Sequence, residues 1–179
     1  PAHHSARLSA GISYNPRAYY RMAGKRKYYV DTSWPTFSIN YTGCFRLGDA
    51  TSHFHRMAVS VKQVFDISVF VKMSYTAFAG KQFSTKEIYY PDYKHFSSSG
   101  WMLNYDGFER NFFTGVFYDL ATDKEWFGGA LNYNSPYLLL KNIPALQHQP
   151  YDEALHVRYL WTPTVKNYLE VGYSMGMGN

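Results

Sequence analysis

Histidine and serine are the residues of this chain that could form a hydrolytic site, and both are spread along its length. A site that cleaves an ester would need a serine, a histidine and a carboxylate or amide that meet near one rim of the fold. No Gly-x-Ser-x-Gly segment is present, and serine is common, so the pattern carries no specific signal. We predict no enzymatic activity and assign no catalytic residue. The histidines that could take part are His53, His55, His95, His148 and His156.

A metal site is the next chemistry that the residue types allow. His53 and His55 lie two apart, so on a strand they share one face, and Asp49 is nearby. Two histidines and a carboxylate can hold zinc, but no ordered third or fourth ligand follows. Cys44 is the only cysteine, which excludes a disulfide framework and a cysteine cluster. We predict no metal and no cofactor.

Charged residues offer little further chemistry. Asp152 and Glu153 are adjacent, so on a strand they point to opposite faces and cannot act as an acid/base pair. The run 92–95 could form a charged loop contact. The net charge is +5, and its densest part is the run 25–27 beside Arg21. We interpret that run as a solvated or lumen-facing loop, with lipid headgroup phosphates as a further partner. A nucleic-acid surface would need a longer basic stripe, so none is predicted.

The composition narrows the class of protein. Aromatic residues make up 20% of the chain, and charged residues only 17%, against roughly 25% in soluble domains. This combination fits a soluble all-β domain or an outer-membrane barrel with aromatic girdles and a wet interior. No apolar run reaches the roughly 18 residues of a membrane helix, and no signal peptide is visible. Because the chain begins at Pro1 without a methionine, we expect a fragment.

Alternation of apolar and polar residues with a period of two dominates the chain and predicts roughly nine β-strands. Many of them approach the roughly 9–11 residues that a tilted strand needs to cross a bilayer, whereas strands of globular proteins have a mode near 5–6. We therefore predict an all-β fold, an antiparallel up-and-down meander forming part of a transmembrane β-barrel. The predicted strands are 8–14, 37–45, 57–62, 69–76, 101–108, 112–119, 126–134, 155–161 and 169–177.

The alternation also divides the strand residues into two faces. The polar face suits a water-filled lumen and the apolar face suits lipid. Tyr and Trp at strand ends, such as Trp34, Tyr159 and Trp161, suit the headgroup level. The lumen-facing candidates are Lys62, Lys72, His156, Arg158 and Glu170. The lipid-facing candidates are Phe37, Ile39, Tyr41, Leu155, Val157, Leu169, Val171 and Met175.

Several segments, in order, resemble one family. They include Ser-Trp-Pro-Thr-Phe-Ser-Ile-Asn-Tyr at 33–41, Leu-Leu-Lys-Asn-Ile-Pro-Ala-Leu at 139–146 and Tyr-Leu-Glu-Val-Gly-Tyr-Ser-Met-Gly at 168–176. The family is a group of large Bacteroidota outer-membrane proteins. Its members carry an N-terminal carboxypeptidase-regulatory-like β-sandwich, which is not catalytic, and a C-terminal barrel domain of unassigned function.

The resemblance implies that residues 1–179 form a single barrel-domain fragment, the C-terminal part of the barrel. The sandwich, the earlier strands and a closing strand are then absent. Two departures from the family pattern are visible. Asn-Tyr-Asn-Ser at 132–135 replaces a Glu-His-His-Phe-Asn run, and Lys141-Asn142 reverses the family's Asn-Lys order. The resemblance therefore carries over no role for the replaced run.

Three interpretations follow. The first is a barrel of the Gram-negative cell outer membrane that acts in transport, envelope assembly or anchoring, with membrane lipid and envelope proteins as partners. The second is a soluble, lipocalin-like barrel that binds an apolar ligand, and the third is an outer-membrane barrel hydrolase. The first two predict opposite polarity, because Phe37 and Ile39 would face lipid in one and the interior in the other. In the first, Lys62, Lys72 and Arg158 would favour anionic solutes.

Overall fold

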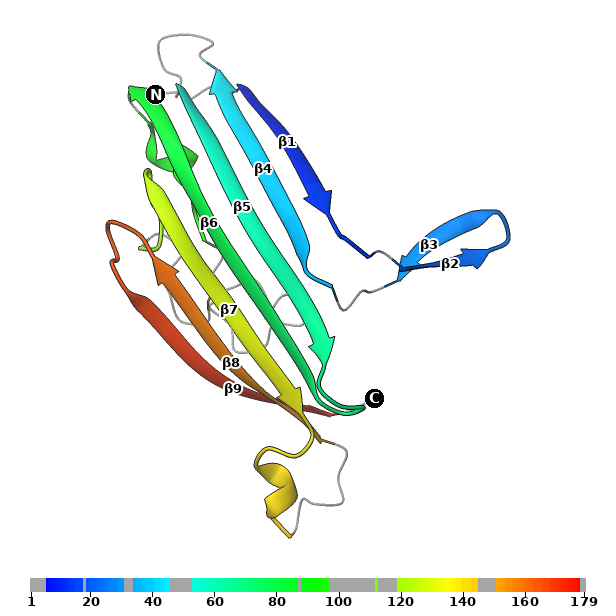
Figure 1. The fold of residues 1–179 in the computed structure, drawn as a ribbon. Helices are drawn as coiled ribbons and strands as arrows, with labels where there is room; N and C mark the ends of the chain where they lie inside the picture. The colour runs from blue at the N-terminus through cyan, green and yellow to red at the C-terminus, as the bar shows by residue number, and fades with distance from the viewer. Residues whose placement is uncertain are drawn as a thin grey trace.

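The computed structural model describes residues 6–17, 19–30, 34–45, 53–86, 88–96, 112, 119–144 and 151–177. Within these residues the chain forms strands and two short 3₁₀ turns (Figure 1). The strands are β1 (Ala6–Tyr14), β2 (Tyr19–Ala23), β3 (Arg26–Val30), β4 (Thr36–Phe45), β5 (His53–Asp66), β6 (Lys72–Lys86), β7 (Glu125–Ser135), β8 (Tyr151–Trp161) and β9 (Tyr168–Met177). The 3₁₀ turns are η1 (Tyr90–Asp92) and η2 (Leu140–Asn142). None of the described helices is long and apolar enough to cross a membrane.

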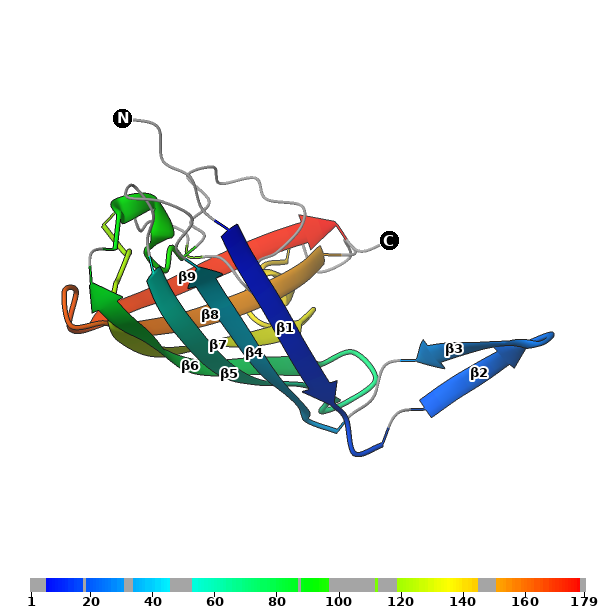
Figure 2. The ribbon, with the colours of Figure 1, turned by 90° about the horizontal axis from the view of Figure 1, so that it is seen from above.

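Seven strands form one sheet in the order β1-β4-β5-β6-β7-β8-β9, and every neighbouring pair is antiparallel. The prediction of an all-β antiparallel meander is therefore confirmed. The chain departs from a simple meander once, between β1 and β4, where β2 and β3 form a separate hairpin. Figures 1 and 2 show this hairpin projecting away from one end of the sheet.

Three strand boundaries differ clearly from the predicted ones. The strand predicted at 57–62 spans His53–Asp66, the one predicted at 69–76 spans Lys72–Lys86, and the one predicted at 155–161 begins at Tyr151. The β5–β6 turn spans 67–71, because the backbone N–H groups of Ile67 and Ser68 both donate to the Val71 carbonyl. Val69 was predicted to lie in a strand, and it lies in this turn. No strand is predicted between 14 and 37, where the chain forms the β2–β3 hairpin, so Arg21, Arg26 and Lys27 lie in strands rather than in a loop. The predicted strand 101–108, and all of 112–119 except its two end residues, lie outside the described residues.

The sheet is curved and gives the molecule two unlike faces. Figure 2 shows it as a trough, with η1 and the other described parts of the β6–β7 connection on its concave side. In the described residues, β1 and β9 are the two edges and do not pair with each other. The described structure is therefore an open curved wall.

An apolar cluster holds the β6–β7 connection against the concave face. Its members are Phe96, Phe112, Leu120, Trp126 and Leu160, and the Phe96 ring centroid lies 6.3 Å from those of both Phe112 and Trp126. Trp126 lies directly opposite Gly80 in the β6–β7 register. A Cβ at Gly80 would collide with the indole, so only glycine lets the ring lie flat on β6.

Candidate functional site

A row of side chains crosses the concave face from β4 to β9. Residues directly opposite each other in an antiparallel sheet point to the same face, so the register fixes the membership of the row. It runs through Thr36, Lys62, Thr76, Ala130, Arg158 and Glu170. Lys62 and Arg158, which are far apart in sequence, thus face the same interior. Arg158 and Glu170 are direct neighbours and are both buried.

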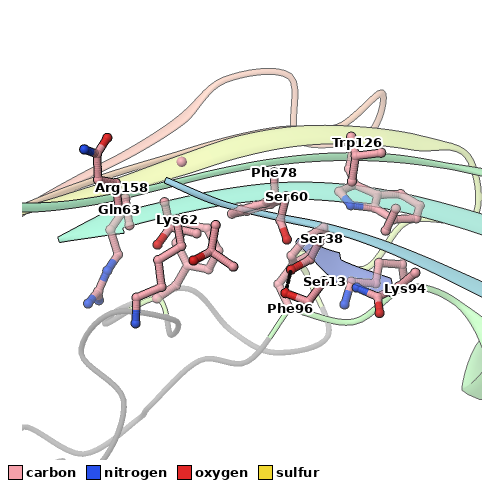
Figure 3. A pocket seen from close by; sticks show the side chains of 18 of the residues that line it. Ser13, Ser38, Ser60, Lys62, Gln63, Phe78, Lys94, Phe96, Trp126 and Arg158 are labelled. Carbon is pink, nitrogen blue, oxygen red and sulfur yellow. Dashed lines mark hydrogen bonds between the residues drawn. The ribbon is translucent and has the colours of Figure 1, made fainter. Parts of the chain in front are cut away.

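A cavity of about 720 Å³ lies against this row. The cations Lys62, Lys94 and Arg158 line it together with hydroxyl groups, and no Asp or Glu is among its described lining residues. Figure 3 shows Lys62 reaching from β5 and Lys94 from the β6–β7 connection on the same side of the sheet. The Ser13 and Ser38 hydroxyls, 3.1 Å apart, share a hydrogen bond beside them. Such a lining attracts anions because positive charge in a concave, partly desolvated site is weakly screened.

Lys94 is oriented by its backbone and by an aromatic ring. Its N–H donates to the Thr122 carbonyl at 2.8 Å, and the Thr122 N–H donates back at 3.0 Å. Its ammonium lies 5.4 Å from the centroid of the Phe96 ring, within the range of a cation–π contact. Burial, with a smaller contribution from Arg56, lowers the pKa of Lys94 below its usual range.

Asp92 anchors η1 to three strands. Its carboxylate, buried to 1% exposure, pairs with the Arg7 guanidinium of β1. Its backbone carbonyl accepts a hydrogen bond of 2.5 Å from Arg56 of β5. Arg56 also donates twice to Gln82 of β6, at 2.8 and 3.1 Å. The charged loop contact predicted for this segment is present, and it fastens the connection inside the trough.

A second polar row lies one step closer to the β5–β6 turn. Ser74, Asn132 and His156 are direct neighbours in the register of β6, β7 and β8. Asn132 Nδ2 donates to Ser74 Oγ at 3.3 Å, and Asn132 Oδ1 is 2.8 Å from His156 Nδ1. On the other side of the imidazole, His156 Nε2 is 2.8 Å from Ser174 Oγ of β9. Polar side chains therefore form a continuous hydrogen-bonded chain across four strands.

The convex face carries the other half of the alternation. Seven of the eight lipid-facing candidates are exposed there, and the eighth, Tyr41, is half-buried and shares a hydrogen bond of 2.6 Å with His55 Nδ1. Val171 is 72% exposed near the middle of β9. The exposed candidates are Phe37, Ile39, Leu155, Val157, Leu169, Val171 and Met175.

Glu153 anchors the β7–β8 connection at the other end of the wall. It is buried, and its carboxylate accepts hydrogen bonds from the N–H of Leu139 at 2.8 Å and of Leu140 at 3.1 Å. The Tyr173 hydroxyl donates to it at 2.7 Å. Asp152 is exposed, so the two carboxylates form no acid/base pair. Glu153 has a structural role in holding η2.

The comparisons with known proteins place the chain in a family. Residues 1–175 match the model of the C-terminal domain of a family of unknown function, DUF5686. The chain belongs to this family. No curated protein and no solved structure matches the chain. The expected relationship to the C-terminal domain of a family without an assigned function is thereby confirmed.

The five lumen-facing candidates do not all line the cavity of the DUF5686 domain. Lys62 and Arg158 line the cavity, and His156 and Glu170 are buried on the same face. Lys72 lies at the end of the wall, with its ammonium 4.0 Å from Asp66 and 60% of its side chain exposed. It is not among the described lining residues. The assignment of these faces to lumen and lipid stays a prediction.

The histidines of the DUF5686 domain fall into separate places. The rings of His53 and His55 lie 5.3 Å apart, whereas Asp49 and His148 lie outside the described residues. Among the residues that the structure describes, no group of three or more His, Cys, Asp or Glu could hold a metal ion. The sequence assigns no specific role to Gln82, Asn132 or Ser174, because the hydrogen bonds of each depend on how the strands are aligned.

Proposed function

We propose that the DUF5686 domain forms part of the wall of a β-barrel in the cell outer membrane. Its concave side lines a wet lumen that favours anionic solutes. The observation that carries the proposal is the continuous apolar convex face, which has no described element packed over its middle. Soluble monomers rarely expose an apolar patch larger than a few hundred Å². In a bilayer the same face would contact the lipid chains, and pairing between strands would satisfy the hydrogen-bonding groups of the backbone.

The polarity of the two faces supports a membrane barrel over a soluble one. In a lipocalin-like barrel, Phe37 and Ile39 would point into the interior to hold an apolar ligand. Here both are exposed on the convex face, and Ser38 and Asn40 line the concave cavity. Strand length gives independent support, since β5 has 14 residues and β6 has 15, enough to cross a hydrocarbon core at a tilt.

The β2–β3 hairpin supports a contact with lipid headgroups. It exposes Tyr19, Tyr20, Met22 and Tyr28 around the basic run 25–27. The Lys27 ammonium lies 4.9 Å from the centroid of the Tyr20 ring, so charge and aromatic surface are presented together. Amphipathic aromatic rings and cations are the groups that settle at a membrane interface. Membrane lipid is therefore the partner that we propose, with envelope proteins as further partners.

We infer the source and the domain composition of the parent protein from the family resemblance. We propose a Bacteroidota protein that carries an N-terminal carboxypeptidase-regulatory-like sandwich, with this domain as the C-terminal part of its barrel. Transport is the role that the cationic cavity supports best. Envelope assembly and anchoring would need a partner site on the rim.

Fractionation of the full-length protein tests the proposal. We expect recovery in the outer-membrane fraction and a gel mobility that changes on boiling, because a closed barrel resists detergent until it is heated. Recovery in the soluble fraction without detergent would contradict the proposal. In that case the convex face must be covered by another part of the protein.

Removal of the cavity cations is expected to weaken anion selectivity. In planar bilayers, Lys62→Gln combined with Lys94→Gln should lower the anion-to-cation permeability ratio by about threefold or more, because charges lining a narrow pore set its selectivity. Lys72→Gln is the matched control, since Lys72 lies at the end of the wall beside Asp66 and should leave the ratio unchanged. Equal effects of the two changes would show that the cavity is not on the conduction path.

A further inference from the structure

Three strands bring a serine, a histidine and an amide together on the concave face. Ser174 Oγ is 2.8 Å from His156 Nε2, and His156 Nδ1 is 2.8 Å from Asn132 Oδ1. This is the order and spacing of a nucleophile, a base and an orienting group. We propose that Ser174, His156 and Asn132 form a hydrolytic triad that cleaves a water-soluble carboxylic ester on the lumen side of the wall. The proposal goes beyond passage of anions.

The hydrogen bonds set the imidazole in the tautomer that this chemistry needs. Asn132 Nδ2 donates to Ser74 Oγ, so the Asn132 oxygen faces the imidazole and accepts from His156 Nδ1–H. In a neutral imidazole the other nitrogen is then unprotonated. His156 Nε2 therefore accepts a hydrogen bond from the Ser174 hydroxyl. Asn132 acts as the orienting group, as the asparagine does in Cys-His-Asn proteases.

Burial differs among the three residues in the way that catalysis requires. Asn132 and His156 are each 4% exposed, whereas Ser174 is only half-buried. Small residues surround the hydroxyl, with Ala154 directly opposite Ser174 and Gly176 two positions along the same face. Among the residues that the structure describes, a Cβ at Gly176 would meet no atom within 4 Å, so this part of the molecule leaves space beside the nucleophile. The base is shielded while the nucleophile can be reached.

The position of the triad selects the substrate class. It lies on the concave face beside the row that contains Lys62 and Arg158, and Arg158 is the next inward-facing residue after His156 on β8. The exposed apolar side chains of β8 and β9 lie on the opposite face, so acyl chains of a surrounding bilayer cannot reach Ser174 through the sheet. The substrate is therefore a soluble ester carried by the lumen rather than a membrane lipid.

The reaction needs only the ester and water. Ser174 Oγ attacks the ester carbonyl carbon, and its proton passes to His156 Nε2. The bond to the leaving alkoxide breaks, and Nε2 returns the proton to that oxygen, which leaves an acyl group on Ser174. Water then gives a proton to Nε2 and attacks the acyl carbon. The Ser174 oxygen leaves and takes the proton back, which releases a carboxylic acid.

A fluorophosphonate probe tests the triad in the full-length protein purified in detergent. Attack by Ser174 forms an Oγ–P bond and expels fluoride, and His156 takes the proton. We expect peptide mass spectrometry to find the tag on Ser174, and p-nitrophenyl acetate to be hydrolysed above the buffer rate. Ser174→Ala should abolish both. Asn132→Ala should slow hydrolysis by about 100-fold or more, and Asn132→Asp should retain it, since a carboxylate also accepts from Nδ1–H.

Ser9→Ala is the matched control. Ser9 is also an inward-facing serine, with its hydroxyl 3.2 Å from that of Thr42, and its loss should change neither readout. If Ser174 stays untagged in protein with native tryptophan fluorescence, or if Ser174→Ala hydrolyses at the wild-type rate, the proposal is overturned and the four-strand chain only holds the wall. Faster cleavage of phospholipid in mixed micelles would overturn the soluble substrate class. None of these readouts depends on outer-membrane recovery or on ion selectivity.

Discussion

Replacing Asp92 with alanine is expected to detach the β6–β7 connection from the concave face and to lower the free energy of unfolding by about 2–4 kcal/mol. The carboxylate is buried to 1% exposure and neutralises Arg7, while Arg56 is held by the Asp92 carbonyl. Without it, no nearby carboxylate among the described residues offsets the repulsion between the Arg7 and Arg56 guanidinium groups. Breaking a fully buried pair costs about 3–5 kcal/mol, and the value is lower here because 45% of the Arg7 side chain is exposed.

Urea unfolding of the full-length protein in detergent measures this loss, with Trp126 fluorescence as one readout because the indole lies in the cluster under the connection. Hydrogen exchange of 88–96 should rise together with the loss of stability. Asp119→Ala is the matched control, since Asp119 is an exposed carboxylate of the same connection and its removal should be near neutral. If Asp92→Ala were equally neutral, η1 would be held by the apolar cluster alone.

Much of the sheet could be predicted because strand alternation is a local signal. The segments that became β1, β4, β7, β8 and β9 each place apolar residues at every second position, and burial of one face is enough to fix their pairing. The hairpin at 19–30 was missed because it lacks this alternation. Tyr19 and Tyr20 are adjacent and the basic run 25–27 follows, so no alternation separates this hairpin from a loop. Val69 and Val71 continue the alternation of β6 into the turn, which displaced that boundary.

The site could be predicted only in part, because its contacts depend on register. Alternation alone placed Lys62 and Arg158 on the polar face, but their shared row exists only because the turns align β5 to β8. His156 lies 24 positions from Asn132 and 18 from Ser174, and no local pattern links them. Arg7 and Asp92 are 85 positions apart. Serine and asparagine are common on polar strand faces, so neither could be selected from the sequence.

Alternation also does not say which face is concave, and that is the point on which a membrane barrel and a soluble barrel differ. The structure turns the polar face inward. Val171→Lys is therefore expected to prevent stable insertion of the barrel, at a cost of about 2–4 kcal/mol for a lysine near the bilayer midplane. Val171 pairs with Val157 near the middle of its strand and is 72% exposed on the convex face. In a soluble protein the same change would stay within about 0.5 kcal/mol.

The readout is the fraction of full-length protein that refolds into lipid vesicles and shows heat-modifiable mobility, and it should fall sharply for Val171→Lys. Val69→Lys is the matched control. Val69 is 86% exposed, but it lies in the β5–β6 turn beyond the end of the wall, where a lysine reaches the headgroups and water. A soluble protein would tolerate both changes alike. If lipid lies against the convex face, a lysine at the more exposed Val69 is tolerated and one at Val171 is not. The contrast between the two variants therefore tests membrane insertion separately from any loss of folding.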